Sequence, residues 1–151
     1  MAHSSFCFEE PEHSPGFLMW QTTVNWQRLI KKALEPHHIS HAQFVLLALL
    51  LWKQGKGERV TQVDLVKMSQ LDKMTVSKSL KKLVSMNLVE RYENQEDTRA
   101  KLVLLTEAGA ILTRKLVPMV KNRDADFFGQ LNNQEKQGLI GILKKLIGKK
   151  L

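Results

Sequence analysis

Lysine and hydroxyl side chains alternate along residues 73–82 in a pattern suited to binding a polyanion. The set comprises Lys73, Thr75, Ser77, Lys78, Lys81 and Lys82. Ammonium groups bind phosphates, and hydroxyl groups can hydrogen-bond to base edges in the major groove of DNA. Arg99, two residues after Asp97, carries a guanidinium that suits the narrower minor groove. These residues predict contact with double-stranded DNA, although lysines on an isolated helix face are more often simply solvated.

Other residues that could do chemistry lack nearby partners. His37 and His41 could lie one helical turn apart and bind a metal ion, but no cysteine or carboxylate cluster beside them completes a zinc site. Cys7 has no adjacent lysine or arginine to stabilise a thiolate, so we expect an inert thiol rather than an oxidant sensor. The sequence also has no local Cys–His or Ser–His pair and no phosphate-binding loop. We therefore expect no metal, no cofactor and no catalytic residues.

The lysines and hydroxyl groups need a helix that turns them toward solvent. Apolar residues of 73–86 fall at positions i, i+4, i+7 and i+8: Val76, Leu80, Leu83 and Val84. This spacing predicts a helix with these four side chains on its buried face. Thr61 and Asp64 predict a capping box that starts a preceding helix, which ends near Ser69. Short polar side chains at 69–72 predict the turn between the two helices.

A β-hairpin is expected after this helix pair. Residues 88–92 and 101–105 predict two strands, and the polar residues 93–100 predict a charged tip between them. Residues 41–54, before the pair, are apolar nearly all round and predict a helix buried on several sides. Together these elements predict a winged helix-turn-helix over residues 41–105.

The flanking segments are expected to be helical. An apolar stripe predicts a helix over 16–34 that Pro36 ends, and a long helix over 107–128 is expected to kink at Pro118 rather than stop. A last helix should begin near Asn132 or Asn133. Residues 1–15 lack periodicity and are expected to form a flexible arm. The expected fold class is mainly α with a small β-hairpin wing.

Length and composition narrow the class of protein. A chain of 151 residues fits a single domain, here residues 1–151. Lysine and arginine number 23 against 15 acidic residues, and the net charge of +8 favours a polyanionic partner. A signal-peptide pattern is not visible, and the longest apolar run, residues 44–52, is too short to cross a bilayer. We therefore expect a soluble, cytoplasmic protein without a membrane partner.

Residues 60–91, VTQVDLVKMSQLDKMTVSKSLKKLVSMNLVER, and 96–109, EDTRAKLVLLTEAG, resemble the MarR family of bacterial transcriptional regulators. The most specific segments are 75–78 (TVSK), 97–99 (DTR) and 105–109 (LTEAG). Two departures stand out. Asn87 replaces the glycine that usually follows the recognition helix, at little cost because asparagine tolerates a left-handed backbone. Residues 37–40 (HHIS) replace the usual Gly-Leu-Thr link.

The resemblance implies a homodimeric repressor. Helices 16–34 and 107–151 would form the dimer, and two recognition helices would bind a pseudopalindromic operator. It further implies that Asp97 pairs with Arg99 or another arginine, such as Arg91, to hold the wing in shape. A small aromatic or amphipathic effector would bind between the dimerisation helices and the winged helix. Three tryptophans could line such a pocket or simply pack in the core: Trp20, Trp26 and Trp52.

An alternative function stays open from sequence alone. A helical ligand-binding protein or enzyme with nonspecific affinity for polyanions would share the basic composition. Ionic strength distinguishes a DNA-binding regulator from such a protein. Binding to duplex DNA weakens steeply as salt is raised, whereas binding or conversion of a small molecule need not depend on salt in this way.

Overall fold

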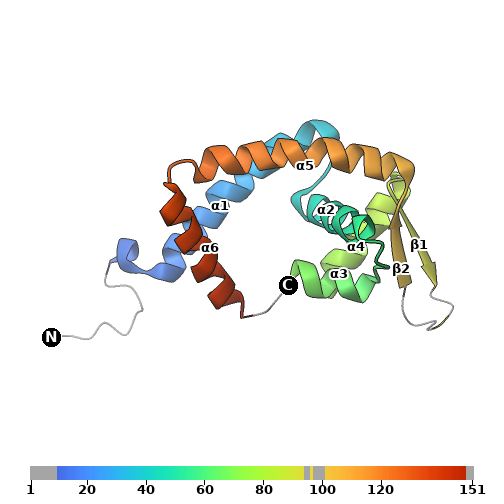
Figure 1. Cartoon of the computed structure of the whole chain (residues 1–151), viewed down its shortest axis with the longest axis horizontal. Helices are drawn as coiled ribbons and strands as arrows, with labels where there is room; N and C mark the ends of the chain where they lie inside the picture. Colours follow the sequence, from blue (N-terminus) through green and yellow to red (C-terminus); the bar gives the residue numbers. More distant parts are fainter. Residues whose placement is uncertain (1–9, 94–95, 97–100, 149–151) are drawn as a thin grey trace.

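A computed structural model describes residues 10–93, 96 and 101–148. Its elements, in chain order, are α1 (Pro15–Leu34), α2 (His41–Gly55), α3 (Gln62–Ser69), α4 (Lys73–Ser85), β1 (Val89–Glu93), β2 (Lys101–Leu105), α5 (Glu107–Phe128) and α6 (Asn133–Ile147). The long helix α5 runs across the top of Figure 1 with α1 packed against it, and α6 lies at the end opposite the hairpin. Helices α2, α3 and α4 pack together beside the hairpin.

The winged helix encloses an apolar core. The central helix α2 contacts α3, α4 and α5 and carries the expected run of apolar side chains, of which Leu46, Leu47 and Leu50 are fully buried. Leu65 from α3 and Leu80 from α4 are also fully buried. Because every helix of this unit contributes leucines to one cluster, the unit holds itself together within a single chain.

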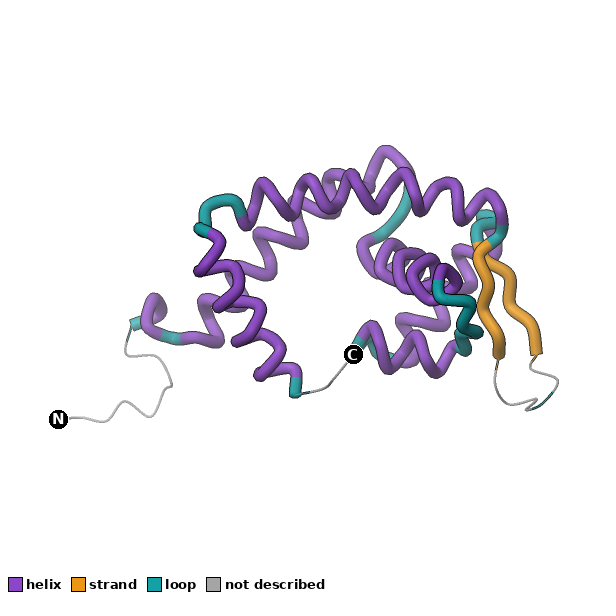
Figure 2. The backbone as a smooth tube through the Cα atoms, in the orientation of Figure 1, coloured by secondary structure: helices purple, strands orange, loops and turns teal. Residues whose placement is uncertain are grey.

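The hairpin packs beside these helices in an antiparallel register that pairs Val89 with Leu105 and Glu93 with Lys101. Figure 2 shows the two strands at one end of the molecule, against the helices. The backbone N–H of Val103 donates to the carbonyl of Val60 (2.9 Å). The segment that leads into α3 is thereby attached to the sheet, so the wing and the helix-turn-helix form one unit.

The winged helix joins α5 through a close backbone contact. Thr106 caps α5 by accepting from the N–H of Gly109 (2.9 Å), and its hydroxyl donates to the carbonyl of Asn87 (2.7 Å). Asn87 adopts the left-handed backbone (φ 59°) that its replacement of glycine requires. A Cβ atom on Gly109 would lie 1.9 Å from the carbonyl oxygen of Leu88, so only glycine fits at this crossing.

The sequence predicted the helices and strands within about two residues, with two differences. α5 continues through Pro118, as expected. Val84, expected on the buried face of α4, is exposed, and Ser79 is buried in its place, so the buried face is turned by about one position. Residues 11–13, placed in a flexible arm, form the short 3-10 helix η1 (Pro11–His13), and α1 begins at Pro15, directly after the Ser14 cap. Residues 1–9, including Cys7, lie outside the described residues.

The outer helices α1 and α6 leave apolar side chains exposed. α6, all of which the structure describes, has no buried residue. Its exposed apolar side chains are Ile140, Ile142, Leu143, Leu146 and Ile147, and those of α1 are Leu18, Met19 and Trp20. Within the described part of the chain, no helix is both long and apolar enough to cross a membrane.

Candidate nucleic-acid interface

The exposed helix α4 is held at its start by an aspartate. α3 ends at Ser69, Gln70 takes a left-handed conformation (φ 61°), and Asp72 then caps α4. The carboxylate of Asp72 accepts from the side-chain hydroxyl of Thr75 (2.6 Å) and from its backbone N–H (2.7 Å). These bonds lower the pKa of Asp72, so the carboxylate stays ionised and fixes the first turn. The sequence prediction missed this role, although an aspartate directly before a helix is a recognised cap signal.

The structure turns the predicted cationic face of α4 away from the core. Its exposed cationic side chains are Lys73, Lys78, Lys81 and Lys82. Among the described residues, none of these four lysines forms an ion pair. The opposite face is buried through Val76, Leu80 and Leu83. α4 therefore presents free positive charge on a rigid surface, as binding to a phosphate backbone requires.

The two hydroxyl residues differ from the lysines in exposure. Thr75 and Ser77 are half-buried. Because the hydroxyl hydrogen of Thr75 is donated to Asp72, this side chain can offer only a lone pair or its methyl group to a base edge. Met74, beside Thr75, is 66% exposed at the same end of the helix. An apolar side chain there could contact a thymine methyl group, a role that the predicted site did not include.

Only part of the predicted wing site falls within the described residues. Arg91 is half-buried on β1 and pairs with Val103 of β2 in the strand register. Asp97 and Arg99 lie outside the described residues, so their pairing and the minor-groove role of Arg99 stay predictions. The structure does place both strands that carry this tip next to α3 and α4, on the winged-helix side of the molecule.

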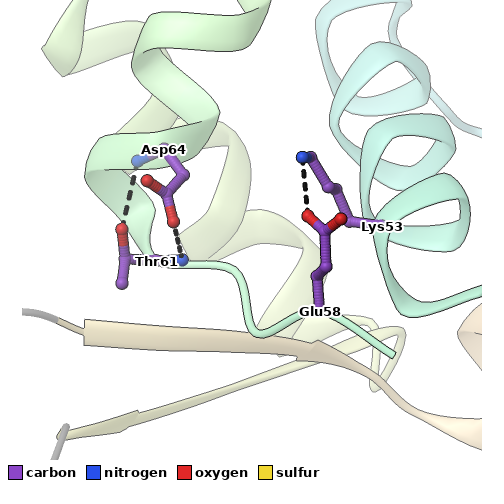
Figure 3. Close-up of polar contacts among 4 residues, drawn as sticks. All are labelled: Lys53, Glu58, Thr61 and Asp64. Atoms are coloured by element: carbon purple, nitrogen blue, oxygen red, sulfur yellow. Dashed lines mark hydrogen bonds and ion pairs between the residues drawn. The ribbon is translucent and has the colours of Figure 1, made fainter. Parts of the chain in front are cut away.

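Polar contacts fix the start of α3 and the loop before it (Figure 3). Thr61 and Asp64 form the predicted capping box: the Asp64 N–H donates to the Thr61 hydroxyl (3.1 Å), and the Asp64 carboxylate accepts from the Thr61 N–H (2.9 Å). Lys53 at the end of α2 binds Glu58 in the loop (2.7 Å). This bond lowers the pKa of Glu58. The first helix of the helix-turn-helix thus begins from a fixed position.

The three tryptophans occupy three different surroundings. Trp26 is half-buried, and its indole N–H donates to the carboxylate of Asp124 on α5 (2.7 Å). Trp20 is 68% exposed on α1. Trp52 lies at the far end of α2, where the ammonium group of Lys56 lies 4.1 Å from its ring centroid. These surroundings do not support one pocket lined by all three, and only Trp26 lies between the outer helices and the winged helix.

The histidines of the link lie in different settings. His41 begins α2, and its ring packs edge-on against Trp26 with the centroids 4.9 Å apart. Burial lowers the pKa of His41, and the negative charge of Asp124 opposes that shift. His37 instead ends the short helix η2 (Glu35–His37). In the part of the chain that the structure describes, no group of three or more His, Cys, Asp or Glu side chains could hold a metal ion.

Known proteins similar to this chain include a winged-helix family and bacterial transcriptional regulators. A family model described as an ArnR1-like winged-helix domain matches residues 35–123. The HTH-type transcriptional regulator YdcH of Bacillus subtilis is 39% identical over 139 residues, which cover 91% of this chain and 95% of that protein. The multiple antibiotic resistance protein MarR of Escherichia coli is 29% identical over 133 residues, which cover 87% of this chain and 90% of MarR.

The chain belongs to the MarR family. It is a DNA-binding transcriptional regulator, as the resemblance in sequence implied. A structure of Bordetella bronchiseptica BpsR, from work on regulation of its DNA binding by 6-hydroxynicotinic acid, superposes with a TM-score of 0.82 at 26% identity. That superposition covers 92% of this chain and 96% of BpsR.

Two structures of E. coli MarR, another member of the MarR family, differ in their similarity to this chain. A MarR variant complexed with operator DNA gives a TM-score of 0.79 at 30% identity and covers 94% of this chain and 99% of MarR. Wild-type MarR in its apo form gives a TM-score of 0.69 at 28% identity and covers 88% of this chain and 96% of that MarR chain. The arrangement of helices here is therefore closer to that of the operator complex.

Proposed function

We propose that this protein is a homodimeric repressor that binds a pseudopalindromic operator through α4. The observation that carries the proposal is the free cationic face of α4 above a first turn fixed by Asp72. A major groove accepts a helix presented in this way. A regulator rather than an enzyme, acting on chromosomal DNA in the cytoplasm, accounts for this surface and for the net charge of +8.

The dimer is inferred from the outer helices. Exposed apolar side chains on α1 and α6 include Trp20 and Leu146, which are 68% and 69% exposed in the single chain. A second copy that covers them would remove this apolar area from water. Two α4 helices related by a two-fold axis would then reach half-sites about 34–36 Å apart, which is one helical turn of DNA. We infer that residues 16–34 and 107–151 supply the dimerisation helices.

We assign separate roles to the side chains of the interface. Thr75, Ser77 and Lys78, near the start of α4, read base edges. Lys73, Lys81 and Lys82 bind phosphates on either side. Arg99 enters the minor groove from the wing tip, and Asp97 with Arg91 holds the tip in shape.

We further propose that a small acidic effector modulates DNA binding. BpsR, a structural relative, is regulated by 6-hydroxynicotinic acid. In this chain, a cavity of about 420 Å³ between α1 and α5 is lined by Lys32, His37 and Arg123 and by apolar side chains that include Leu29 and Met119. A small carboxylate with an apolar ring would match this combination of charge and apolar surface.

Selection of genomic fragments by the purified protein tests the proposal. We expect enrichment of a pseudopalindrome, with binding that weakens steeply as salt is raised. Repeating the selection with 6-hydroxynicotinic acid tests the effector, which should change the yield of the same fragments. Equal recovery of operator and random duplexes at all salt concentrations would instead support nonspecific binding by a basic protein.

Two lysine substitutions separate base reading from phosphate binding. Lys82→Ala should weaken all duplexes about equally and lower the salt slope by about 1. Lys78→Ala should flatten the preference among operator variants by about 1–3 kcal/mol at the affected base pair. Lys145→Ala, on the exposed surface of α6, is the matched control and should change neither quantity. Unchanged binding by both α4 variants would remove this helix from the interface.

A further inference from the structure

Three side chains from three helices meet where the winged helix joins the outer helices. Trp26 of α1 donates its indole N–H to the carboxylate of Asp124 on α5 (2.7 Å). The ring of His41, the first residue of α2, packs edge-on against the same indole at 4.9 Å. All three side chains are half-buried. We call these residues the α1–α5–α2 joint.

The joint connects the helices proposed for dimerisation with the winged helix proposed to bind DNA. α1 and α5 pack against each other outside the winged helix, whereas α2 is the central helix of the unit that carries α4. The indole N–H can only donate and an ionised carboxylate can only accept, so their bond fixes the edge of the indole ring. Because His41 packs on that ring, the start of α2 is set relative to α1 and α5. A change at His41 can therefore alter where α4 lies with respect to the rest of the dimer.

We propose that the α1–α5–α2 joint positions the winged helix for DNA binding, and that protonation of His41 releases it. This inference rests on the proposed binding of DNA through α4. The structure, in which the joint is closed, resembles operator-bound MarR more than apo MarR.

Burial of the His41 ring, opposed by a neighbouring charge, decides the direction of the effect. Asp124 acts on His41 from α5, and the cavity of about 550 Å³ that His41 lines is also lined by Lys31 of α1, Glu35 of η2 and His38 of the link. Burial lowers the pKa of His41 and outweighs the opposing charge of Asp124. A released, solvated imidazole would return toward the ordinary histidine pKa of about 6.5 and bind a proton more readily.

Protonation of His41 should change DNA affinity in the opposite direction to protonation of exposed histidines. Because the released arrangement binds the extra proton, the closed arrangement is fully favoured above the ordinary histidine pKa and loses population as the pH falls below it. Acidification should then weaken DNA binding through His41. Protonation of exposed histidines does the opposite, since it adds positive charge that attracts DNA. The two effects can therefore be separated by substitution.

The test measures binding of the full-length protein to the duplex enriched in the selection. Lowering the pH from about 7.5 to about 5.5 should weaken DNA binding by the wild-type protein by up to about tenfold more per subunit than by His41→Gln. Glutamine at this position cannot gain the proton. His13→Gln is the matched control, because His13 lies in η1, outside the joint and the proposed binding sites, and it should keep the wild-type profile. Identical profiles for wild type and His41→Gln would overturn the proposal.

Two further variants examine the positioning role. Trp26→Phe keeps a ring beside His41 but removes the N–H that holds Asp124, so it should weaken DNA binding at neutral pH while the protein stays folded. Asp124→Asn keeps an oxygen that can accept from Trp26 but removes the charge. It should bind normally at neutral pH and lose at least as much affinity as wild type in acid. Normal binding by Trp26→Phe over the whole pH range would contradict the positioning role.

A measurement without DNA separates this inference from the proposed function. The indole N–H resonance of Trp26, identified by its loss in Trp26→Phe, should move as His41 titrates and stay fixed in His41→Gln. If no duplex is enriched but this resonance moves as described, the proposed function fails and the joint stands. If duplexes are enriched but the resonance is the same in wild type and His41→Gln at every pH, the joint fails and the proposed function stands.

Discussion

The winged helix and α6 differ in whether their leucine side chains are buried within the single chain. Both are rich in leucine and lysine. In the winged helix the leucines of α2, α3 and α4 are buried against one another, and the lysines face solvent. In α6, which the structure describes in full, no residue is buried, and apolar side chains such as Leu146 lie in the open. The first region is complete in one chain, whereas the second is the surface that we propose a second copy covers.

This difference suggests that part of the free energy of unfolding comes from burial within one chain and part from association of two chains. Burial of the leucine cluster stabilises the winged helix whether or not a second chain is present. In the proposed dimer, the exposed apolar side chains of α1 and α6 are buried only on association, so their contribution depends on protein concentration. Substitutions in the two regions should therefore differ in size, in sign and in their dependence on concentration.

Gly109→Ala should have the largest effect. A Cβ atom would lie 1.9 Å from the carbonyl oxygen of Leu88, and separating the two backbone segments would disturb the bonds by which Thr106 caps α5 and holds Asn87. We expect a loss of about 3 kcal/mol or more in the free energy of unfolding, independent of protein concentration. Urea denaturation at two concentrations measures this. A loss below about 1 kcal/mol would show that the hairpin and α5 can separate at little cost.

The fold was predictable because its signals are local. The capping box of Thr61 and Asp64, the apolar stripe of α4 and the two strands are each defined by spacings of two to four residues. The left-handed backbone at Asn87 also follows from the residue type. Within the winged helix only the edge of the α4 stripe was wrong, because Val84 lies at the margin of the buried face and periodicity does not decide such a position.

The candidate site was less completely predictable. The lysines of α4 follow from periodicity, but the bond that commits the Thr75 hydroxyl to Asp72 depends on side-chain rotamers. The contact of Trp26 with Asp124 joins residues 98 positions apart, and no local pattern indicates it. Sequence reasoning grouped the tryptophans by type, whereas the structure separates them by location.

Leu146→Lys should have the next largest effect, on association rather than on folding. Lysine keeps the helix propensity of this position and suits the last turn of α6, so the helix itself should survive. Loss of one buried leucine costs about 1.5–3 kcal/mol, and a two-fold dimer loses two, so dissociation should increase at least about 100-fold. Sedimentation at several concentrations measures this. Lys145→Gln, in the same turn, is the control and should leave the dimer intact.

Gly138→Ala should have the smallest effect and the opposite sign to Gly109→Ala. Both glycines lie within helices, but a Cβ atom on Gly138 would meet no described heavy atom within 4 Å. Alanine reduces the conformational freedom that the unfolded chain loses on folding, so the free energy of unfolding should rise by about 0.5–1 kcal/mol. Thermal denaturation at high protein concentration, where the dimer is populated, provides the measurement. A decrease there, together with weaker association, would mean that the second chain packs directly against this glycine, and the exposed surface used in dimerisation would then extend to the cationic side of α6.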